Sequence, residues 1–296
     1  MIFLGVFMND INEIKENYEN WNKILADFST RGYKKSIMGI VDILGFKNFV
    51  QKEKENSVKT VIEAIRDSIM LNKMAISTTV KYAILSDTII VYSENVDSDN
   101  VFYVIHALGN LQLELLRHRF LCRGALVTAE NYINNDIIVS EALIKAHLIE
   151  EKIAIYPRII IDEEVFKIIK PQIDSGKIMN DKKYLTKDAV IRDYDGKYVL
   201  NTLCLISDVY AYINEDFKYF QNLHEDNNMK LYRQSMYEFK NNIQDYYVSV
   251  LKDGSLNKNI LSKLNYLVNY YNRILNLSIL FPKNLRSELY LAYFDK

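Results

Sequence analysis

The chain has 296 residues, a formal net charge of −1, 49% hydrophobic residues and 25% charged residues. This composition is that of an ordinary soluble globular protein, and the near-neutral charge gives no sign of a dominant nucleic-acid-binding surface. No apolar run reaches the ~20 residues of a membrane helix, and the opening MIFLGVF is too short for a signal peptide and lacks a basic region. We therefore expect a cytoplasmic protein with no nucleic-acid partner and no membrane partner.

Apolar spacing in the first half of the chain predicts strands that alternate with helices. Apolar residues every three or four positions are typical of helices, and short runs rich in β-branched residues are typical of strands. The polar segments 31–36 and 131–136 are predicted to be loops or turns. The elements predicted up to residue 128 are, in chain order, a helix at 10–28, a strand at 37–44, a helix through 58–69, strands at 79–85 and 88–93, a helix at 97–118 and a strand at 120–128.

The second half continues this alternation and then becomes helical. Proline lacks the amide hydrogen that a helix interior needs, so one helix is predicted to stop before Pro171. Asp195 and Gly196 predict a hairpin turn. The remaining predicted elements are a helix at 139–153, a strand at 156–162, a helix near 163–170, a polar irregular segment at 172–190, a hairpin within 190–206 and helices from 213 to the end.

The resulting order is β-α-β-β-α-β-α-β-α-β-β, followed by helices. This order predicts an α+β fold of the ferredoxin-like type, in which one sheet carries packed helices. We divide the chain into an N-terminal helical segment (1–34), a central α+β domain (35–208) and a helical C-terminal region (209–296).

Two aspartates interrupt strands that are otherwise apolar. Asp42 lies in IMGIVDILGFKNF, and Asp87 lies in YAILSDTIIVY at the tip of the predicted hairpin. A ferredoxin-like order makes the first strand a neighbour of this hairpin, so the two carboxylates would repel each other without a cation between them. Mg²⁺ prefers a few hard oxygen ligands and leaves positions for water or phosphate. The pair therefore predicts a metal site, although an aspartate at a strand end can also serve only as a cap or turn residue.

The residues that follow Asp42 are suited to binding phosphate. Gly45 allows the backbone to bend close to a ligand. The predicted helix that begins with Phe46 and Lys47 presents free N–H groups at its start, and such groups bind anions.

Five motifs together resemble a known family. VDILGF, SDTIIVY and CRGALVTAE, in this order, resemble the class III nucleotidyl (adenylate and guanylate) cyclase catalytic domain. VSEALIKAHLIEEKIAIYPRIIID and RDYDGKYVLNTL resemble more narrowly the Pycsar-type pyrimidine cyclases of bacterial antiphage defence. The resemblance spans residues 35 to 206 and implies a class III cyclase sandwich with a C-terminal helical extension.

The activity that this resemblance implies is formation of a cyclic nucleotide. A cytoplasmic homodimer would bind Mg²⁺ or Mn²⁺ and convert CTP or UTP to cyclic CMP or cyclic UMP plus pyrophosphate. The product would act as a second messenger on a cyclic-nucleotide-responsive effector protein.

The resemblance also implies roles for single residues. The implied metal ligands are Asp42, Asp87 and the Ile43 carbonyl, and Asp42 and Asp87 would be catalytic together with Arg123. The implied substrate-binding residues are Gly45, Phe46 and Lys47 around the triphosphate, Tyr82 facing the base and Lys197 near the substrate.

The chain departs from the purine cyclases at two positions on one helix. Those enzymes carry an Asn and an Arg, four residues apart, where this chain has Ile144 and Leu148. Glu130 also stands where many cyclases have Gly. These differences leave open a catalytically inactive cyclase-fold module that binds a nucleotide or a partner. A palm-type polymerase or diguanylate cyclase relative is a third alternative, which the missing GGDEF-like or GGDD-like hairpin tip disfavours.

Overall fold

The computed structural model describes residues 11–75, 79–134, 137–175, 189–203, 225–277 and 283–294. The predicted irregular segment therefore lies largely outside the described residues, as do the end of the predicted hairpin and the first predicted C-terminal helical residues. No helix in the described ranges combines the length and the hydrophobicity needed to cross a membrane.

Eight described strands form one sheet in the order β2-β3-β1-β4-β6-β8-β7, and β5 pairs with β4. Within this sheet β4 and β6 are parallel, and the other neighbouring pairs are antiparallel. The strands are β1 (Lys34–Ile43), β2 (Lys81–Leu85), β3 (Thr88–Ser93), β4 (Cys122–Ile133), β5 (Ile138–Ser140), β6 (Ile159–Ile161), β7 (Val190–Arg192) and β8 (Tyr198–Leu200).

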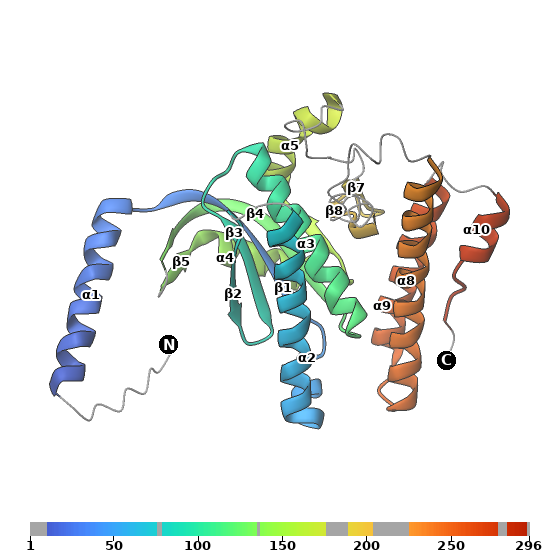
Figure 1. Ribbon diagram of the computed structural model, residues 1–296, viewed down its shortest axis with the longest axis horizontal. Helices are drawn as coiled ribbons and strands as arrows, with labels where there is room; N and C mark the ends of the chain where they lie inside the picture. The colour runs from blue at the N-terminus through green and yellow to red at the C-terminus, as the bar shows by residue number, and fades with distance from the viewer. Residues whose placement is uncertain are drawn as a thin grey trace.

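The helices of the described chain pack on this sheet or stand at its ends (Figure 1). Strands β2-β3-β1-β4 with α2 and α3 form the antiparallel arrangement expected of a ferredoxin-like fold, so the predicted α+β class is confirmed. The helices are α1 (Ile11–Arg31), α2 (Phe46–Ala75), α3 (Ser98–Arg117), α4 (Glu141–Lys152), α5 (Glu163–Ser175), α8 (Glu225–Lys252), α9 (Lys258–Leu277) and α10 (Lys283–Leu289).

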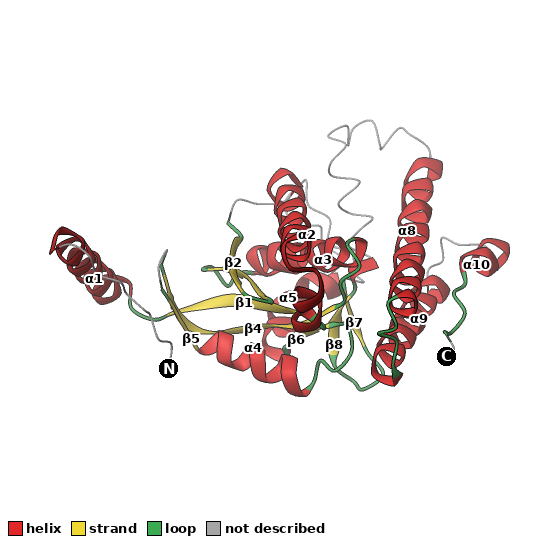
Figure 2. Ribbon diagram, turned by 90° about the horizontal axis from the view of Figure 1, so that it is seen from below, coloured by secondary structure: helices red, strands yellow, loops and turns green. Residues whose placement is uncertain are grey.

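Alternation along β1 separates two hydrophobic cores. Ile37, Val41 and Ile43 pack toward α2, α3 and α5, whereas Met38 and Ile40 pack toward α4. Figure 2 shows α4 on one face of the sheet and α2 and α3 on the other. Because side chains alternate along a strand, Asp42 belongs to the α4 face.

Helix α3 is buried over most of its length. Asp97 caps its start by accepting a hydrogen bond from the Asn100 amide at 2.9 Å. His106, near the middle of the helix, is 7% exposed, and its Nδ1 has no hydrogen-bond partner among the described residues. Burial lowers the pKa of His106 to about 4, so this imidazole is neutral at physiological pH.

A third core joins the sheet region to the C-terminal helices. Leu113 and Leu116 of α3 and Leu121 before β4 share this core with buried residues of α8 and α9. Leu44, which directly follows β1, packs against the same core. Its other buried members include four residues of α9: Leu264, Val268, Tyr271 and Leu275.

The paired strands β1 and β4 are longer than the sequence predicts. Lys34 and Lys35 lie in a predicted loop, but they pair with Asn131 and Glu130 and so belong to the sheet. Strand β4 continues through the predicted turn as far as Ile133 and forms a hairpin with β5. Polar residues suggested a turn there, but the backbone hydrogen bonds of two adjacent strands favour extension.

The prediction that a helix stops before Pro171 is wrong. Helix α5 runs on to Ser175 with Pro171 inside it. Ile169 and Ile173, on either side of the proline, both pack against the first core. Their burial offsets the backbone hydrogen bond that proline cannot donate.

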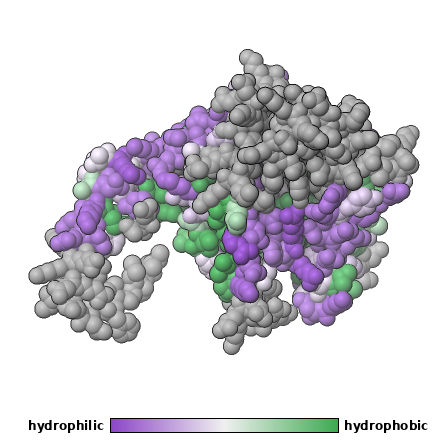
Figure 3. Space-filling view, in the orientation of Figure 1, coloured by the Kyte–Doolittle hydropathy of each residue, from purple (hydrophilic) through white to green (hydrophobic). Residues whose placement is uncertain are grey.

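Helix α1 projects away from the sheet at the end opposite the C-terminal helices (Figure 1). The Tyr132 hydroxyl of β4 donates a hydrogen bond to the Asp27 carboxylate of α1 at 2.9 Å. Figure 3 shows hydrophobic surface between α1 and α2, over the sheet edge that carries β2. Ile84 and Leu85 of β2 are each about half exposed.

Candidate active site

The structure brings Asp42 and Asp87 together at one end of the sheet. Asp42 is the penultimate residue of β1 and is paired with Thr88, the first residue of β3. The Ile43 amide donates a hydrogen bond to the Asp87 carbonyl oxygen at 3.1 Å. Asp87 is therefore fixed beside the end of β1 through its own backbone.

The turn that carries Asp87 is tight. Only Ser86 and Asp87 separate β2 from β3, and Ser86 has a φ of +60°. A positive φ at the first central residue is the geometry of a type II′ hairpin turn, which matches the twist of the flanking strands. The two-residue length fixes where the Asp87 backbone lies relative to β1.

Three side chains of neighbouring elements complete the charged cluster. Arg123 of β4 is paired in register with Asp42, and its Nε lies 3.8 Å from Asp42 Oδ2. The same Nε forms an ion pair with Glu150 of α4. His147, one turn earlier on α4, has its Nδ1 3.4 Å from Glu150 Oε2.

Negative charge in this cluster is only partly neutralised. Burial, Glu150 and Asp87 raise the pKa of Asp42 to about 6, against the opposing effects of Arg123 and His147. Burial also raises the pKa of Glu150, although Arg123 opposes the shift. Buried carboxylates with raised pKa values are stabilised by a cation, and oxygen ligands are those that Mg²⁺ and Mn²⁺ prefer. The donor set at Asp42 and Asp87 therefore fits such an ion.

Glu150 was not predicted from the sequence as a site residue. It is 2% exposed and lies on the buried face of α4 with Ala142 and Ala146. The three residues recur at a spacing of four, so they share one face of the helix. A carboxylate that continues a stripe of small buried residues is the signal that could have revealed it.

The segment after Asp42 forms a turn and then a helix, as predicted. The Leu44 amide donates to the Leu121 carbonyl oxygen at 2.8 Å, and Gly45 has a φ of +79°. Phe46 begins α2 and packs on the first core, whereas Lys47 is exposed. The start of α2 thus lies within a few residues of Asp42, with a cationic side chain exposed to solvent.

Two of the residues implied in substrate binding do not lie beside Asp42. Tyr82 of β2 packs with the first core, on the sheet face opposite the α4 face that carries Asp42. Lys197 lies in the turn between β7 and β8, where its carbonyl oxygen accepts a hydrogen bond from the Asp193 amide at 2.8 Å. Strands β4 and β6 separate that hairpin from β1.

The two positions where the chain departs from purine cyclases point into solvent. Ile144 and Leu148 on α4 are 65% and 44% exposed. They lie one helical turn apart and so form a short apolar stripe on the outer side of α4.

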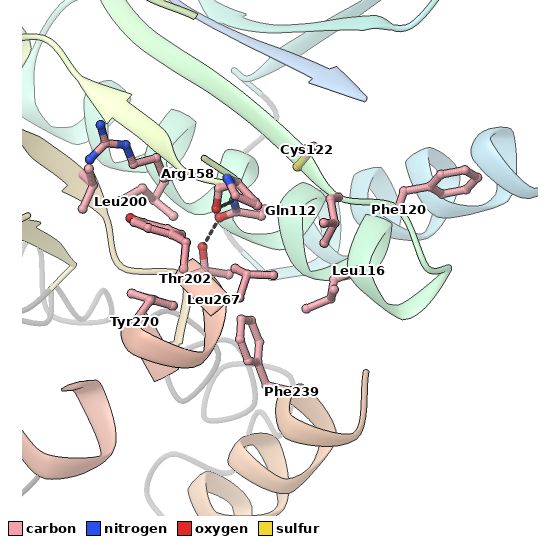
Figure 4. A pocket seen from close by; sticks show the side chains of 14 residues that line it. Gln112, Leu116, Phe120, Cys122, Arg158, Leu200, Thr202, Phe239, Leu267 and Tyr270 are labelled. Atoms are coloured by element: carbon pink, nitrogen blue, oxygen red, sulfur yellow. Dashed lines mark hydrogen bonds between the residues drawn. The ribbon is translucent and has the colours of Figure 1, made fainter. Parts of the chain in front are cut away.

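A small pocket lies between the sheet and the C-terminal helices (Figure 4). It holds about 20 Å³ of space, room for about one water molecule. Figure 4 shows the hydrogen bond between Thr202 and Gln112 at its centre, with Leu116, Phe239 and Leu267 among the surrounding side chains. The pocket is too small for a nucleotide, and its size indicates that the helices pack closely against the sheet.

A second group of possible metal ligands lies on α2 and α3. Oxygen or nitrogen atoms of Asp67, Glu114 and His118 lie within 4.8 Å of one another. The four histidines are scattered in the sequence without an HxxxH motif, so sequence spacing did not reveal this group. Arg66 already pairs with Asp67 at 2.8 Å and Arg117 with Glu114 at 2.6 Å, which makes the group less receptive to a metal than the Asp42 cluster.

A scan with protein-family models and a search of curated proteins give no match. Among solved structures, the guanylate cyclase domain of RhGC from Catenaria anguillulae in complex with GTP is 13% identical, with a TM-score of 0.40 over 57% of this chain and 97% of that chain. A bacterial light-regulated adenylyl cyclase is 12% identical, with a TM-score of 0.37 over 65% of this chain and 64% of that chain.

A third structure is the catalytic core of a rhodopsin-guanylyl cyclase with converted specificity, in complex with ATPαS. It is 14% identical, with a TM-score of 0.37 over 57% of this chain and 96% of that chain. Similarity at this level says nothing about activity or substrate, so the functional argument depends on the residues of this chain.

Proposed function

We propose that this protein is a nucleotidyl cyclase that converts CTP or UTP to a 3′,5′-cyclic nucleotide and pyrophosphate. The observation that carries the proposal is the placement of Asp42 beside the Asp87 turn, within a cluster of buried and partly buried carboxylates whose negative charge is only partly neutralised. The ordered motifs around both aspartates, which resemble class III cyclases, support the same reaction.

Asp42 and Asp87 would hold Mg²⁺ or Mn²⁺, with the Ile43 carbonyl oxygen as a further ligand. Such ions, when bound, would neutralise phosphate charge and make the attacking hydroxyl easier to deprotonate. Arg123 lies between Asp42 and Glu150 and orients the Asp42 carboxylate through its ion pairs. In this arrangement Arg123 supports the site, and a direct contact with phosphate remains a prediction.

The reaction is attack of the ribose 3′-hydroxyl on the α-phosphorus of the same nucleotide, which forms the cyclic phosphodiester and releases pyrophosphate. The chain's contribution is to hold the triphosphate so that the hydroxyl and the phosphorus meet. The start of α2 offers backbone N–H groups to the phosphates, and Gly45 has no atom within 4 Å of where a Cβ would lie. Lys47 is exposed beside these groups.

The preference for a pyrimidine and a role in antiphage signalling rest on the narrower resemblance. Ile144 and Leu148 replace the polar pair of purine cyclases, and both lie on the outer side of α4. Apolar side chains exposed at a helix spacing favour a protein–protein contact. The homodimer is therefore part of the proposal, with this stripe at or near its interface.

The same two residues also favour a second candidate function. If nothing replaces the missing Asn and Arg, the site would bind a nucleotide without cyclising it. In that case the protein would be a nucleotide-binding or interaction module with a cyclase fold.

The test is incubation of the purified full chain with each of ATP, GTP, CTP and UTP plus Mn²⁺, with the products resolved by mass spectrometry. We expect cyclic CMP or cyclic UMP from the native protein and a loss of at least about 100-fold in Asp42→Asn and Asp87→Asn. Asp245→Asn is the matched control, because Asp245 is exposed on α8. Native rates in both site variants would refute the mechanism, and nucleotide binding without product would favour the second candidate.

A further inference from the structure

Helix α9 lies along one end of the sheet, and two of its successive turns contact residues beside neighbouring strands. The Tyr270 hydroxyl donates to Asn201 Oδ1, just after β8, at 2.6 Å. One turn earlier, Tyr266 stacks on Tyr156, three residues before β6, with ring centroids 4.8 Å apart. A helical turn rises 5.4 Å and neighbouring strands lie about 4.8 Å apart. Each turn of α9 therefore lies opposite the next strand of the sheet.

The next turn of α9 carries Lys263, and the next strands in the sheet are β4 and β1. Arg123 lies at the start of β4 and Asp42 near the end of β1, next to Leu121 and Leu44, which pack against the C-terminal helices. Packing agrees with this position, because Leu264 and Ile260 share the third core with Leu44. Lys263 is half-buried there.

Electrostatic effects agree with this position of Lys263. Burial and Arg123 lower the pKa of Lys263, and Asp42 opposes the shift. Because Coulomb interactions weaken with distance, the influence of both groups on this ammonium agrees with the position that the packing of α9 gives it.

The contacts that hold α9 in this position are buried or close-packed. The Tyr266 hydroxyl donates to Asp193 Oδ2 at 2.7 Å, and Arg158, which is 7% exposed, pairs with Asp193 and Asp195. The pocket beside these residues has room for about one water molecule. Lys263 therefore reaches the site from a supported element.

Charge balance identifies what Lys263 would bind. The other cation at the cluster, Arg123, is already engaged by Asp42 and Glu150, whereas no ion pair joins Lys263 to another described residue. A polyphosphate entering beside Asp42 and Asp87 would meet this ammonium, whose three donors suit phosphate oxygens.

We propose that Lys263 binds the polyphosphate of the substrate, so that the C-terminal helical region contributes a site residue within the same chain. This inference rests on the proposed function for the identity of the substrate. Its polyphosphate chemistry can be tested without turnover.

The experiment measures binding of inorganic tripolyphosphate with Mn²⁺ to the full chain, by calorimetry at fixed ionic strength, for Lys263→Met and Lys263→Arg. Lys258→Met is the matched control, because Lys258 is exposed at the start of the same helix. We expect Lys263→Met to weaken binding at least tenfold, Lys263→Arg to restore part of the loss and Lys258→Met to stay within about twofold of the native affinity. Thermal unfolding of each variant checks that the fold is intact.

Turnover separates the two proposals. If Lys263→Met raises the KM for the nucleotide at least tenfold while Asp42→Asn abolishes product, both hold. If Lys263→Met binds tripolyphosphate as the native chain does, or if the native chain does not bind it at all, the inference about Lys263 is overturned. If binding depends on Lys263 but no nucleotide is turned over, the inference holds and the cyclase activity fails.

Discussion

Replacing Gly124 with alanine tests how tightly β1 and β4 must approach to align the site. A Cβ at position 124 would lie 2.1 Å from the Ile40 carbonyl oxygen and 3.3 Å from the Val41 Cα. The obstacle is the backbone of a central buried strand, so a side chain cannot rotate away to relieve it. Relief requires a displacement of roughly 1 Å, and overpacking of this kind costs typically 1–3 kcal/mol, here toward the upper end.

The assay is thermal and urea unfolding followed by circular dichroism. A cost of about 3 kcal/mol lowers the Tm by roughly 5–10 °C in a chain of this size. Gly39→Ala is the matched control in the same strand pair, since its Cβ would meet the Leu108 side chain, with Cδ1 at 2.6 Å. A smaller loss is expected there because a leucine can change rotamer.

The pairing argument also predicts a loss of the proposed cyclase activity in Gly124→Ala. Gly124 is the register partner of Val41, and the adjacent pair in the register is Asp42 with Arg123. A shift of β4 at Gly124 would therefore separate that ion pair. A Gly124→Ala protein with native Tm and native activity would refute the claim that close backbone approach is required at this point.

Two further predictions concern α3. The pKa of His106 is about 4 in the folded protein and 6.5 in the unfolded chain, so the unfolded state takes up the proton first and stability falls as the pH drops from 6.5 toward 4. Urea titrations should show a loss of about 2 kcal/mol between pH 7 and pH 5 that disappears in His106→Gln, and an unchanged pH dependence in that variant would contradict a buried neutral imidazole. Asp97→Ala should cost about 1 kcal/mol by removing the cap, whereas Asp97→Asn should keep most of the stability; equal stability of all three proteins would show that the cap contributes nothing.

The sequence predicts the pairing of Asp42 with the hairpin because that pairing follows from element order. A ferredoxin-like order makes β1 and β3 neighbours whatever the side chains are, and the two-residue turn then limits where Asp87 can lie. The start of α2 after Gly45 was predictable for a similar reason, since a glycine between a strand and a helix marks a local bend.

The positions of Tyr82 and Lys197 were harder to predict because they depend on register. A shift of one residue along a strand moves a side chain to the other face, and the face of β2 is set by its pairing of Tyr82 with Val91. Lys197 lies in the turn of the short β7–β8 hairpin, and the distance of this hairpin from β1 depends on the two strands, β4 and β6, that lie between them.

Glu150 and Lys263 were not predicted because tertiary packing places them. The amphipathic pattern of α4 shows which face is buried, but not that the buried face ends beside Arg123. The pattern of α9 likewise predicts a helix with an apolar stripe. Only the packing of α9 against the sheet brings Lys263 toward Asp42, which is far away in the sequence.

The third core also limits how the chain can be divided. Leu113, Leu116 and Leu121 belong to the α+β region by sequence, yet each is covered by the C-terminal helices and at most 5% exposed. A fragment that ends at residue 208 would expose these leucines to water as a hydrophobic patch, and we expect such a fragment to self-associate. The C-terminal helices are thus a part of the folding unit and could not be exchanged for another appendage in evolution without rebuilding the surface beneath them.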